Sequence, residues 1–427
     1  MECATRKGRN RAKICVGLLL VAGLSCGGQP EPVPERIILI VVDTLRADHV
    51  GAYGGDVSTP SMDRLAASGQ VLPHAVASFH QTTMSMGAMF TGRTPSIETG
   101  DRAVTLPWNG QTFCGLARFA AAAEVACVPA SLNTLAEDLQ GAGFLTIGVV
   151  SNGLLFAPYG FEQGFDQWHE VGPPRSEALV YRSPETAAAS AAREVNGVAR
   201  EALAGHADDS FFLYLHYIDV HDWALSPSEP AYVPSVERFD TELGRLLDWL
   251  EDGGFLEGAT VLLTADHGEA LGEAHAVPGL PRHFGNPSFE TLLRVPLIVS
   301  PPRVADADRT LRSEDIPGLI KEIAGIHRDE LSDLDSDELL VTEMFFQTYR
   351  SGRWKSIWPR DSDQVHLFDL ETDPAESRDV AADHPEVLAR HRERVTLLTA
   401  RLAGDRELSS EMTDEDQRRL RALGYIQ

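Results

Sequence analysis

Residues able to hold a metal ion follow two apolar runs of the chain. Asp43 comes directly after residues 36–42, and the pair Asp266-His267 comes directly after residues 259–265. A carboxylate next to an imidazole suits Zn²⁺ or Mn²⁺ better than Mg²⁺, and an oxygen-rich site also suits Ca²⁺. Taken singly, an aspartate after a strand caps a turn about as often as it binds a metal. The hypothesis of a metal site therefore depends on whether the fold brings Asp43 close to Asp266 and His267.

Two further apolar runs end in polar residues. Ser151-Asn152 follow residues 144–150, and His216 closes residues 211–216. In a sheet of parallel strands, ligands bind beyond the carboxyl ends of the strands. We therefore expect these side chains to lie near the two places named above.

Thr82 could supply a nucleophile to such a site. The run from residue 81 to residue 93 predicts the start of a helix, with Thr82 or Thr83 as its N-cap. A hydroxyl at that position lies beside unpaired N–H groups that favour negative charge. With a cation alongside, the alkoxide becomes accessible near neutral pH. The alternative is that the threonine is only a helix cap.

The elements that must position these residues alternate between strands and helices. We predict strands at 36–43, 144–150, 211–216, 259–265 and 293–299, and helices at 60–68 (capped by Thr59), 132–141, 185–204, 233–252 and 385–403. Continuously apolar strands separated by helices indicate an α/β fold with a large, mostly parallel sheet flanked by helices. The catalytic domain is expected at residues 36–300. After residue 300 polar segments with short strands predict a smaller C-terminal α+β region with a terminal helix, residues 301–427.

Composition and charge limit the class of protein and the kinds of binding partner that we expect. The 427 residues are 43% hydrophobic and 23% charged, which argues against a disordered chain or a multispan membrane protein. The net charge of −26 repels nucleic acid over much of the surface. An anionic substrate must therefore be attracted locally, by a cation or by aimed N–H groups. The sequence does not specify an oligomeric state.

The first 26 residues resemble an export signal. A basic stretch precedes the apolar run 14–24, which is too short to span a bilayer comfortably. Cys26 ends a segment that is similar to a bacterial lipoprotein cleavage site, with residues 27–35 as a polar linker. We expect an exported protein, periplasmic or anchored to the outer membrane through a lipid on Cys26. The alternative is an ordinary cleavage site without lipidation.

Two cysteines remain after that segment, Cys114 and Cys127. In an exported protein they could form a disulfide worth roughly 3 kcal/mol by loop-closure arithmetic. They could equally be two buried thiols.

Nine segments resemble the sulfatase family of the alkaline phosphatase superfamily, in the order in which the family carries them. They are residues 41–54, 58–66, 91–95, 160–166, 216–221, 264–269, 293–299, 367–374 and 420–425. The most specific are Thr-Ala-Asp-His-Gly-Glu at 264–269 and Leu-Arg-Val-Pro-Leu-Ile-Val at 293–299.

The resemblance implies a role for each candidate residue. Asp43, Asp266 and His267 fall on metal-ligand positions, and Thr82 falls on the nucleophile, ten residues before Gly92. We count Thr82 among the metal ligands as well. A second metal is not expected, because the extra Asp-x-x-x-His ligands of two-zinc relatives are not evident near residues 219–221.

The family's remaining positions fall on histidines. His221 corresponds to the histidine that serves the leaving group. His283 lies near the position that contacts the substrate anion, with a surface histidine as the alternative. His216 and Asn152 are weaker candidates for substrate binding.

The departures from the family decide the chemistry that we expect. Formylglycine sulfatases carry Cys or Ser in Cys/Ser-x-Pro-x-Arg, whereas this chain has Thr82-Thr83-Met84-Ser85-Met86. No formylglycine is therefore expected, and the family's Gly-Lys-Trp-His segment has no counterpart. Threonine nucleophiles occur in relatives that cleave phosphodiesters or transfer phosphoryl groups.

We therefore predict a hydrolase of sulfuric or phosphoric esters that uses one divalent metal ion: Ca²⁺, Mn²⁺ or Zn²⁺. The alternatives are a catalytically inactive binding protein on the same scaffold, or a phosphoryl-group transferase.

Overall fold

The computed structural model describes residues 36–97, 104–105, 111–121, 124, 126–172, 191–225, 232–279, 283, 285–327, 334–343 and 345–403. The predictions made for the export signal, Cys26 and the linker lie outside the described residues. The same holds for the first part of the helix predicted at 185–204 and for the family-like segment at 420–425. No helix in the described part of the chain combines the length and the apolar character needed to cross a membrane.

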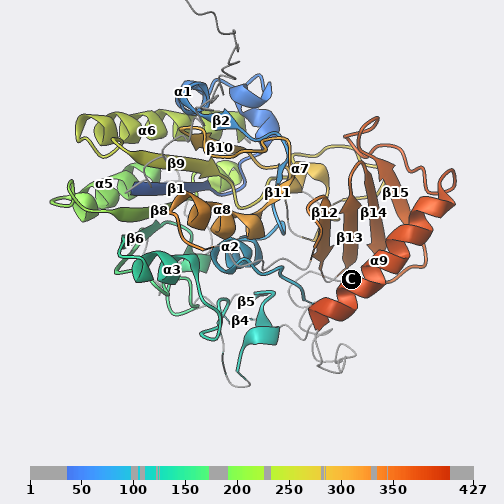
Figure 1. The fold of residues 1–427 in the computed structure, drawn as a ribbon. Helices are drawn as coiled ribbons and strands as arrows, with labels where there is room; N and C mark the ends of the chain where they lie inside the picture. Colours follow the sequence, from blue (N-terminus) through green and yellow to red (C-terminus); the bar gives the residue numbers. More distant parts are fainter. Residues whose placement is uncertain are drawn as a thin grey trace, which may run out of the picture. The chain divides into compact units, whose positions relative to one another are not determined.

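A seven-stranded sheet dominates the fold (Figure 1). Its strands lie in the order β2 (Gln70–Val71), β10 (Leu297–Ser300), β9 (Ala259–Thr264), β1 (Arg36–Val42), β8 (Phe211–Tyr217), β6 (Leu145–Val150) and β7 (Gln167–Glu170). The five strands from β9 to β7 are parallel, and β10 is antiparallel to both of its neighbours. The predicted α/β class with a mostly parallel sheet is confirmed.

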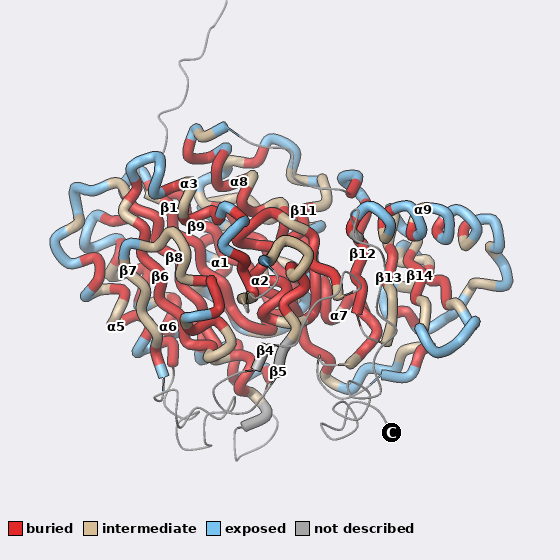
Figure 2. The backbone as a smooth tube through the Cα atoms, turned by 90° about the horizontal axis from the view of Figure 1, so that it is seen from below, coloured by how far each residue is buried: buried red, intermediate tan, exposed pale blue. Residues whose placement is uncertain are grey.

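The apolar runs explain why these segments form the centre of the sheet. Every residue of β8 and β9 is buried, and β1 is buried from its second residue onward. Strands that are apolar on both faces need a helix layer on each side. Figure 2 shows the buried residues concentrated along these central strands, whereas exposed positions alternate along the C-terminal helix α9 (Pro385–Ala403).

Two helix layers cover the sheet (Figure 1). One contains α1 (Pro60–Ser68), α5 (Ala191–Leu203) and α6 (Tyr232–Asp252); the other contains α2 (Thr82–Thr91), α3 (Leu135–Gly141) and α8 (Ile316–Ile323). Short 3₁₀ helices connect the elements: η1 (Ala47–His49), η2 (Gly51–Tyr53), η3 (Ala117–Phe119), η4 (Gly153–Leu155), η5 (His221–Leu225) and η6 (Ser313–Asp315). Two small sheets pair β3 (Ala75–Val76) with β11 (Leu311–Arg312), and β4 (Val104–Thr105) with β5 (Gln111–Thr112).

A four-stranded antiparallel sheet forms the C-terminal part of the described chain (Figure 1). It runs β12 (Glu338–Thr342), β13 (Phe346–Ser351), β14 (Trp354–Pro359) and β15 (His366–Asp369), and α9 lies against it. The apolar side chains of β11 and α8 belong to the core of the main sheet. The domain boundary placed at residue 300 stays a prediction.

The C-terminal sheet is joined to the main sheet by buried contacts. Ile357 and Phe368 pack against Val277 and Phe289. The fully buried Lys355 extends its Nζ to within 3.1 Å of Glu290, at the start of α7 (Glu290–Leu293), and 2.8 Å of Glu376. Because a buried charge is costly unless paired, these ion pairs require the two parts to stay together.

The structure corrects one predicted helix cap and one strand, and it confirms Thr59 at the N-cap position of α1. Gln81 occupies the N-cap position of α2, and neither Thr82 nor Thr83 makes a capping bond there. Thr59 does precede α1, but its hydroxyl accepts the Gly51 N–H at 2.8 Å and makes no capping bond. The Thr59 hydroxyl also donates to Asp63 of α1 at 3.2 Å, whereas the Thr83 hydroxyl bonds to the distant Phe113. The strand predicted at 293–299 begins only at Leu297, because Leu293 is the last residue of α7 and residues 294–296 connect this helix to the strand.

Candidate metal centre and catalytic site

The carboxyl ends of neighbouring strands bring the predicted ligands together. Asp43 follows β1, and Asp266-His267 follow β9, which pairs directly with β1. One ligand atom from each residue lies within 4.8 Å of the other two, and all three residues are fully buried. His267 Nε2 lies 3.5 Å from Asp266 Oδ2 and 4.0 Å from Asp43 Oδ1. Among the described residues, this is the one such group of three.

The hydrogen bonds orient the ligand atoms inward. Asp43 Oδ2 accepts from Asn152 Nδ2 at 2.6 Å, and Asp266 Oδ1 accepts from the Thr44 N–H at 3.1 Å. The opposite oxygens, Asp43 Oδ1 and Asp266 Oδ2, have no hydrogen-bond partner in the described part of the chain. His267 Nδ1 donates to the Gly268 carbonyl at 2.8 Å, so the lone pair of its Nε2 faces the two carboxylates. Two orphaned carboxylate oxygens and one imidazole nitrogen form a donor set suited to a divalent cation.

The charges in this site are unbalanced without a cation. Burial raises the pKa of Asp43 well above its usual value, and the neighbouring Asp266 carboxylate raises it further. Burial also lowers the pKa of His267 to about 4, although Asp266 opposes this shift. The imidazole is therefore neutral near pH 7 and able to act as a ligand. Thr44, which follows Asp43 and donates its N–H to Asp266, has a φ of 61°. This left-handed conformation is rare for a β-branched residue.

Thr82 is the first residue of α2 and points toward the same group. Its Oγ1 lies 3.5 Å from His267 Nε2. Ser85, one turn further, donates its hydroxyl to the Asp266 carbonyl at 2.5 Å and so ties the start of α2 to the end of β9. Met86, which replaces the family's basic residue, is buried in the core, where the Tyr214 hydroxyl lies 4.0 Å from its sulfur.

Two further histidines lie beside the cluster. The ring centroid of His283 is 4.6 Å from that of His267 and 5.5 Å from that of His221. His221 begins η5 and is almost fully buried, whereas 15% of the His283 side chain is exposed. The structure therefore brings both histidines beside the cluster.

The other two predicted residues lie deeper. His216 is fully buried at the end of β8, with its Nε2 4.0 Å from Asp266 Oδ2; burial lowers its pKa to about 4. Among the described residues, neither of its ring nitrogens has a hydrogen-bond partner. Asn152 uses both ends of its amide, donating to Asp43 and accepting the Leu154 N–H at 2.9 Å. The structure thus records Asn152 as a support for Asp43, and substrate binding by either residue stays a prediction.

Sequence reasoning did not assign a role to Glu269. Its carboxylate is fully buried and contacts His283 Nδ1 at 3.0 Å and Trp223 Nε1 at 3.0 Å. Its position three residues after Asp266 was the available signal. Ser85 and Thr44 were likewise missed as supports of Asp266.

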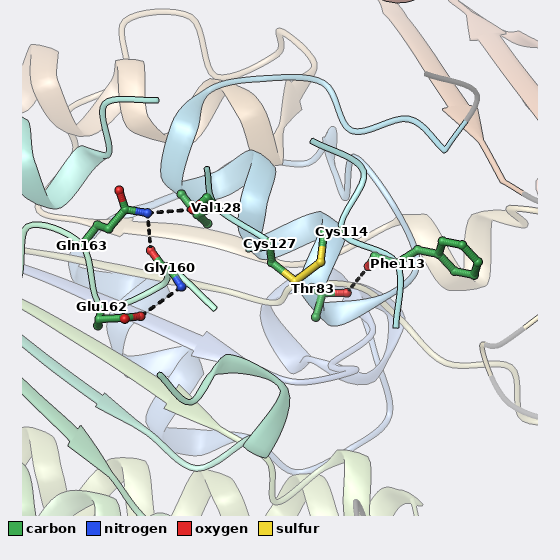
Figure 3. The surroundings of a disulfide bond; sticks show 8 residues. All are labelled: Thr83, Phe113, Cys114, Cys127, Val128, Gly160, Glu162 and Gln163. Atoms are coloured by element: carbon green, nitrogen blue, oxygen red, sulfur yellow. Dashed lines mark hydrogen bonds between the residues drawn. A yellow bond between two sulfur atoms is a disulfide. The ribbon is translucent and has the colours of Figure 1, made fainter. Parts of the chain in front are cut away.

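The disulfide is one of the two alternatives that the sequence left open, and the structure contains it. Cys114 and Cys127 are bonded, and Figure 3 shows the bond beside the start of α2. Thr83 Oγ1 donates to the carbonyl of Phe113 at 2.7 Å. The bridged segment therefore holds the residue that follows Thr82.

Comparisons with known proteins agree with this architecture. The structure of the phosphonate monoester hydrolase of Agrobacterium radiobacter has the same fold, with a TM-score of 0.63 and 15% identity over 89% of this chain and 98% of that chain. The chain thus shares the fold of that hydrolase. A family model described as Sulfatase matches residues 35–321, and the chain belongs to the sulfatase family.

Two curated relatives are more similar in sequence, but only part of each relative is matched. N-acetylgalactosamine-6-sulfatase of Canis lupus familiaris is 27% identical over 293 residues, which cover 60% of this chain and 53% of the relative. Choline-sulfatase of Rhizobium meliloti (strain 1021) is 29% identical over 185 residues, 38% of this chain and 35% of the relative. The chain spans about half the length, or less, of these curated relatives.

Proposed function

We propose that the chain is a metal-dependent hydrolase of sulfuric or phosphoric esters that uses Thr82 as its nucleophile. One observation carries the proposal: the Thr82 hydroxyl lies 3.5 Å from His267 Nε2, within a buried group in which one oxygen of each aspartate, Asp43 Oδ1 and Asp266 Oδ2, lacks a partner among the described residues. Membership of the sulfatase family supports ester hydrolysis as the reaction class. The phosphonate monoester hydrolase and choline-sulfatase named above support an anionic ester as the substrate.

Asp43, Asp266, His267 and Thr82 would hold one divalent cation. The mixed oxygen and nitrogen donors suit Zn²⁺ or Mn²⁺, and Ca²⁺ is a further candidate. When bound, the cation would neutralise the two carboxylates, lower the pKa of the Thr82 hydroxyl and polarise the ester oxygen. Asn152 and Thr44 keep the carboxylates aimed at it, because each donates to the carboxylate oxygen that faces away from the cluster.

The chain's own groups account for two displacement steps. Thr82 Oγ1, after losing its proton to solvent, forms a bond to the sulfur or phosphorus atom while the bond to the leaving oxygen breaks. His221 gives the leaving oxygen a proton, and His283 donates from Nε2 to the anionic oxygens, which requires its imidazolium form with both ring nitrogens protonated. Water then attacks the same atom with its proton passing to His221, and the bond to Thr82 breaks. Phosphoryl esters suit this route best, because threonine cannot expel sulfate by collapsing to an aldehyde.

Turnover of 4-nitrophenyl sulfate, 4-nitrophenyl phosphate and bis-4-nitrophenyl phosphate with Ca²⁺, Mn²⁺ and Zn²⁺ tests the proposal. We expect metal-dependent release of nitrophenol from at least one ester, with Thr82→Ala lowering kcat on the order of 10³-fold or more. Thr91→Ala, at the other end of α2, is the matched control, because Thr91 Oγ1 donates only within the helix, to the Gly87 carbonyl. Turnover that survives in Thr82→Ala would refute the nucleophile.

A second candidate is a metal-binding protein without turnover. Met86 favours it, because a buried thioether replaces the basic residue that relatives direct at the anion. Stoichiometric metal binding with no hydrolysis across the three esters would support this candidate. A phosphoryl-group transferase would instead show ester cleavage that accelerates with an added acceptor alcohol.

We further propose that the chain is exported and that Cys26 carries a lipid. Growth of an expressing bacterium with radiolabelled palmitate should label the wild-type protein and leave Cys26→Ala unlabelled. Label on both proteins, or on neither, would contradict lipidation at this residue.

A further inference from the structure

We propose that Glu269 is a positioning residue that fixes the two histidines outside the metal cluster, His221 and His283. The catalytic consequence rests on the proposed ester hydrolysis, whereas the positioning itself does not. Glu269 comes two residues after His267, at the turn where the chain leaves the end of β9. Its side chain is fully buried, which is unusual for a glutamate unless its oxygens are well partnered.

The two oxygens of the Glu269 carboxylate have different partners. Oε1 lies 3.0 Å from His283 Nδ1 and also accepts the Ala270 N–H at 3.2 Å. Oε2 accepts the indole N–H of Trp223 at 3.0 Å. A carboxylate between two N–H donors holds both in one geometry, since rotating it would lengthen both bonds.

The contact with His283 selects a tautomer. A carboxylate oxygen only accepts hydrogen bonds, so the ring nitrogen facing it must carry a proton. His283 Nδ1 is therefore an N–H donor, and the bond fixes which ring edge faces Glu269. The ring then lies 4.6 Å from that of His267. Without Glu269, a side chain that is 15% exposed could adopt other rotamers.

The contact with Trp223 acts on the other histidine. Trp223 lies two residues after His221 in η5, so anchoring the indole anchors the short helix that carries His221. The rings of His221 and His283 are 5.5 Å apart. The Glu269 carboxylate thus sets the distance between His221, which we assign to the leaving oxygen, and His283, which we assign to the substrate anion.

The backbone of Glu269 is held from a third direction. Arg46, 4% exposed, donates from Nη1 to the Glu269 carbonyl at 3.0 Å. The same guanidinium pairs with Asp48 at 2.7 Å and with Glu273, which is 29% exposed in its side chain. Glu273 belongs to the same loop but contacts Arg46 instead of the histidines. Glu273→Gln is therefore a matched control for Glu269→Gln.

Histidine side-chain NMR provides a test that does not depend on turnover. In protein labelled with ¹⁵N-histidine, a long-range ¹H–¹⁵N spectrum distinguishes the two tautomers, and His283→Gln assigns the signals by their loss. We expect wild-type His283 to carry its proton on Nδ1, both without added metal and with Zn²⁺. Glu269→Ala should lose this signature and Glu273→Gln should keep it. An Nε2–H tautomer in the wild type, or an unchanged tautomer in Glu269→Ala, would overturn the proposal.

Kinetics and calorimetry test the catalytic consequence. Removing such a support typically costs 10- to 100-fold in activity, so we expect Glu269→Ala to lower kcat by roughly that factor, with KM changed less. Glu269→Gln should recover part of the loss, because its single amide oxygen can accept from only one of the two N–H groups. It also serves as the test variant should Glu269→Ala fail to fold.

Metal affinity separates positioning from damage to the ligands. Titration calorimetry with Zn²⁺ should give an affinity within about threefold of wild type for Glu269→Gln, since Asp43, Asp266 and His267 remain in place. An equal loss of kcat and of metal affinity would show that Glu269 acts through the ligands and would reject the proposal. If the wild type hydrolyses no ester, the proposed function fails and the tautomer measurement still decides the role of Glu269.

Discussion

Asp43→Asn should stabilise the metal-free protein while abolishing its response to metal. Asp43 is fully buried, and its Oδ1 has no hydrogen-bond partner among the described residues. Leaving a buried acceptor unpaired costs about 1–3 kcal/mol, and more for a charged group. An asparagine keeps the oxygen that accepts from Asn152 and places an N–H₂ group toward Asp266 Oδ2. We therefore expect a gain of about 2 kcal/mol.

The expected shift in melting temperature follows from the size of the protein. Unfolding entropy is ~2.1 cal mol⁻¹ K⁻¹ per residue, or roughly 0.8 kcal mol⁻¹ K⁻¹ for a folded unit of roughly 400 residues. A gain of about 2 kcal/mol thus raises Tm by about 2–3 °C in EDTA. For the wild type, metal at 100 times its Kd adds about 2.7 kcal/mol, or roughly 3 °C. Asp43→Asn should show no such rise, so the two proteins exchange rank when metal is added.

Asp240→Asn is the matched control. Asp240 is also buried, but its carboxylate is satisfied, because it accepts the N–H groups of Ser61 at 3.0 Å and Met62 at 2.9 Å at the start of α1. Neutralising it should cost about 1 kcal/mol with or without metal. Differential scanning calorimetry measures all three proteins. If Asp43→Asn lowers the melting temperature in EDTA as Asp240→Asn does, the reasoning that the cluster is held ready for a cation is refuted.

Two further predictions concern stability outside the cluster. Replacing the disulfide by alanines (Cys114→Ala with Cys127→Ala) should cost roughly 3 kcal/mol, a fall of about 4 °C in Tm; an unchanged Tm would show that the bridge restrains nothing. Burial, aided by Arg390, lowers the pKa of His391 to about 4 from 6.5. Its contribution to stability is therefore complete above pH 6.5 and lost as the pH falls toward 4. The free energy of unfolding should fall between pH 7 and pH 5, and His391→Asn should make this fall smaller by about 1–2 kcal/mol. The same substitution at the exposed His327 should leave the fall unchanged. Urea titrations at the two pH values measure it, and equal effects of the two substitutions would contradict the prediction.

Periodicity was sufficient for the frame of the fold. The apolar runs predicted β1, β8 and β9 to within a residue, because strands buried on both faces leave a continuous signal. The same pattern also predicted that Asp43 lies near Asp266 and His267, since residues that follow parallel strands share one edge of the sheet. Periodicity did not predict the antiparallel direction of β10. Nothing in three apolar residues and a serine distinguishes an antiparallel neighbour from a parallel one.

Side-chain partners far apart in sequence account for most of what was missed. Local rules made Thr83 an N-cap, but its hydroxyl bonds to Phe113, thirty residues away. Choosing Thr82 as the nucleophile required the family resemblance, because both threonines satisfy the same cap pattern. The role of Glu269 depends on its contact with His283, fourteen residues later, and no periodic pattern in the sequence predicts that contact.

The electrostatics of the site indicate that the proposed cation would serve substrate binding as well as chemistry. Among the described residues, no lysine or arginine forms an ion pair or hydrogen bond with Asp43, Thr82, Asp266 or His267. The protein as a whole carries a net charge of −26, so long-range attraction of an anion is absent too. An anionic ester approaching the bare cluster would meet two buried carboxylates and gain little from neutral imidazoles. A divalent cation held by the cluster would instead attract the anion to the start of α2, where Thr82 lies.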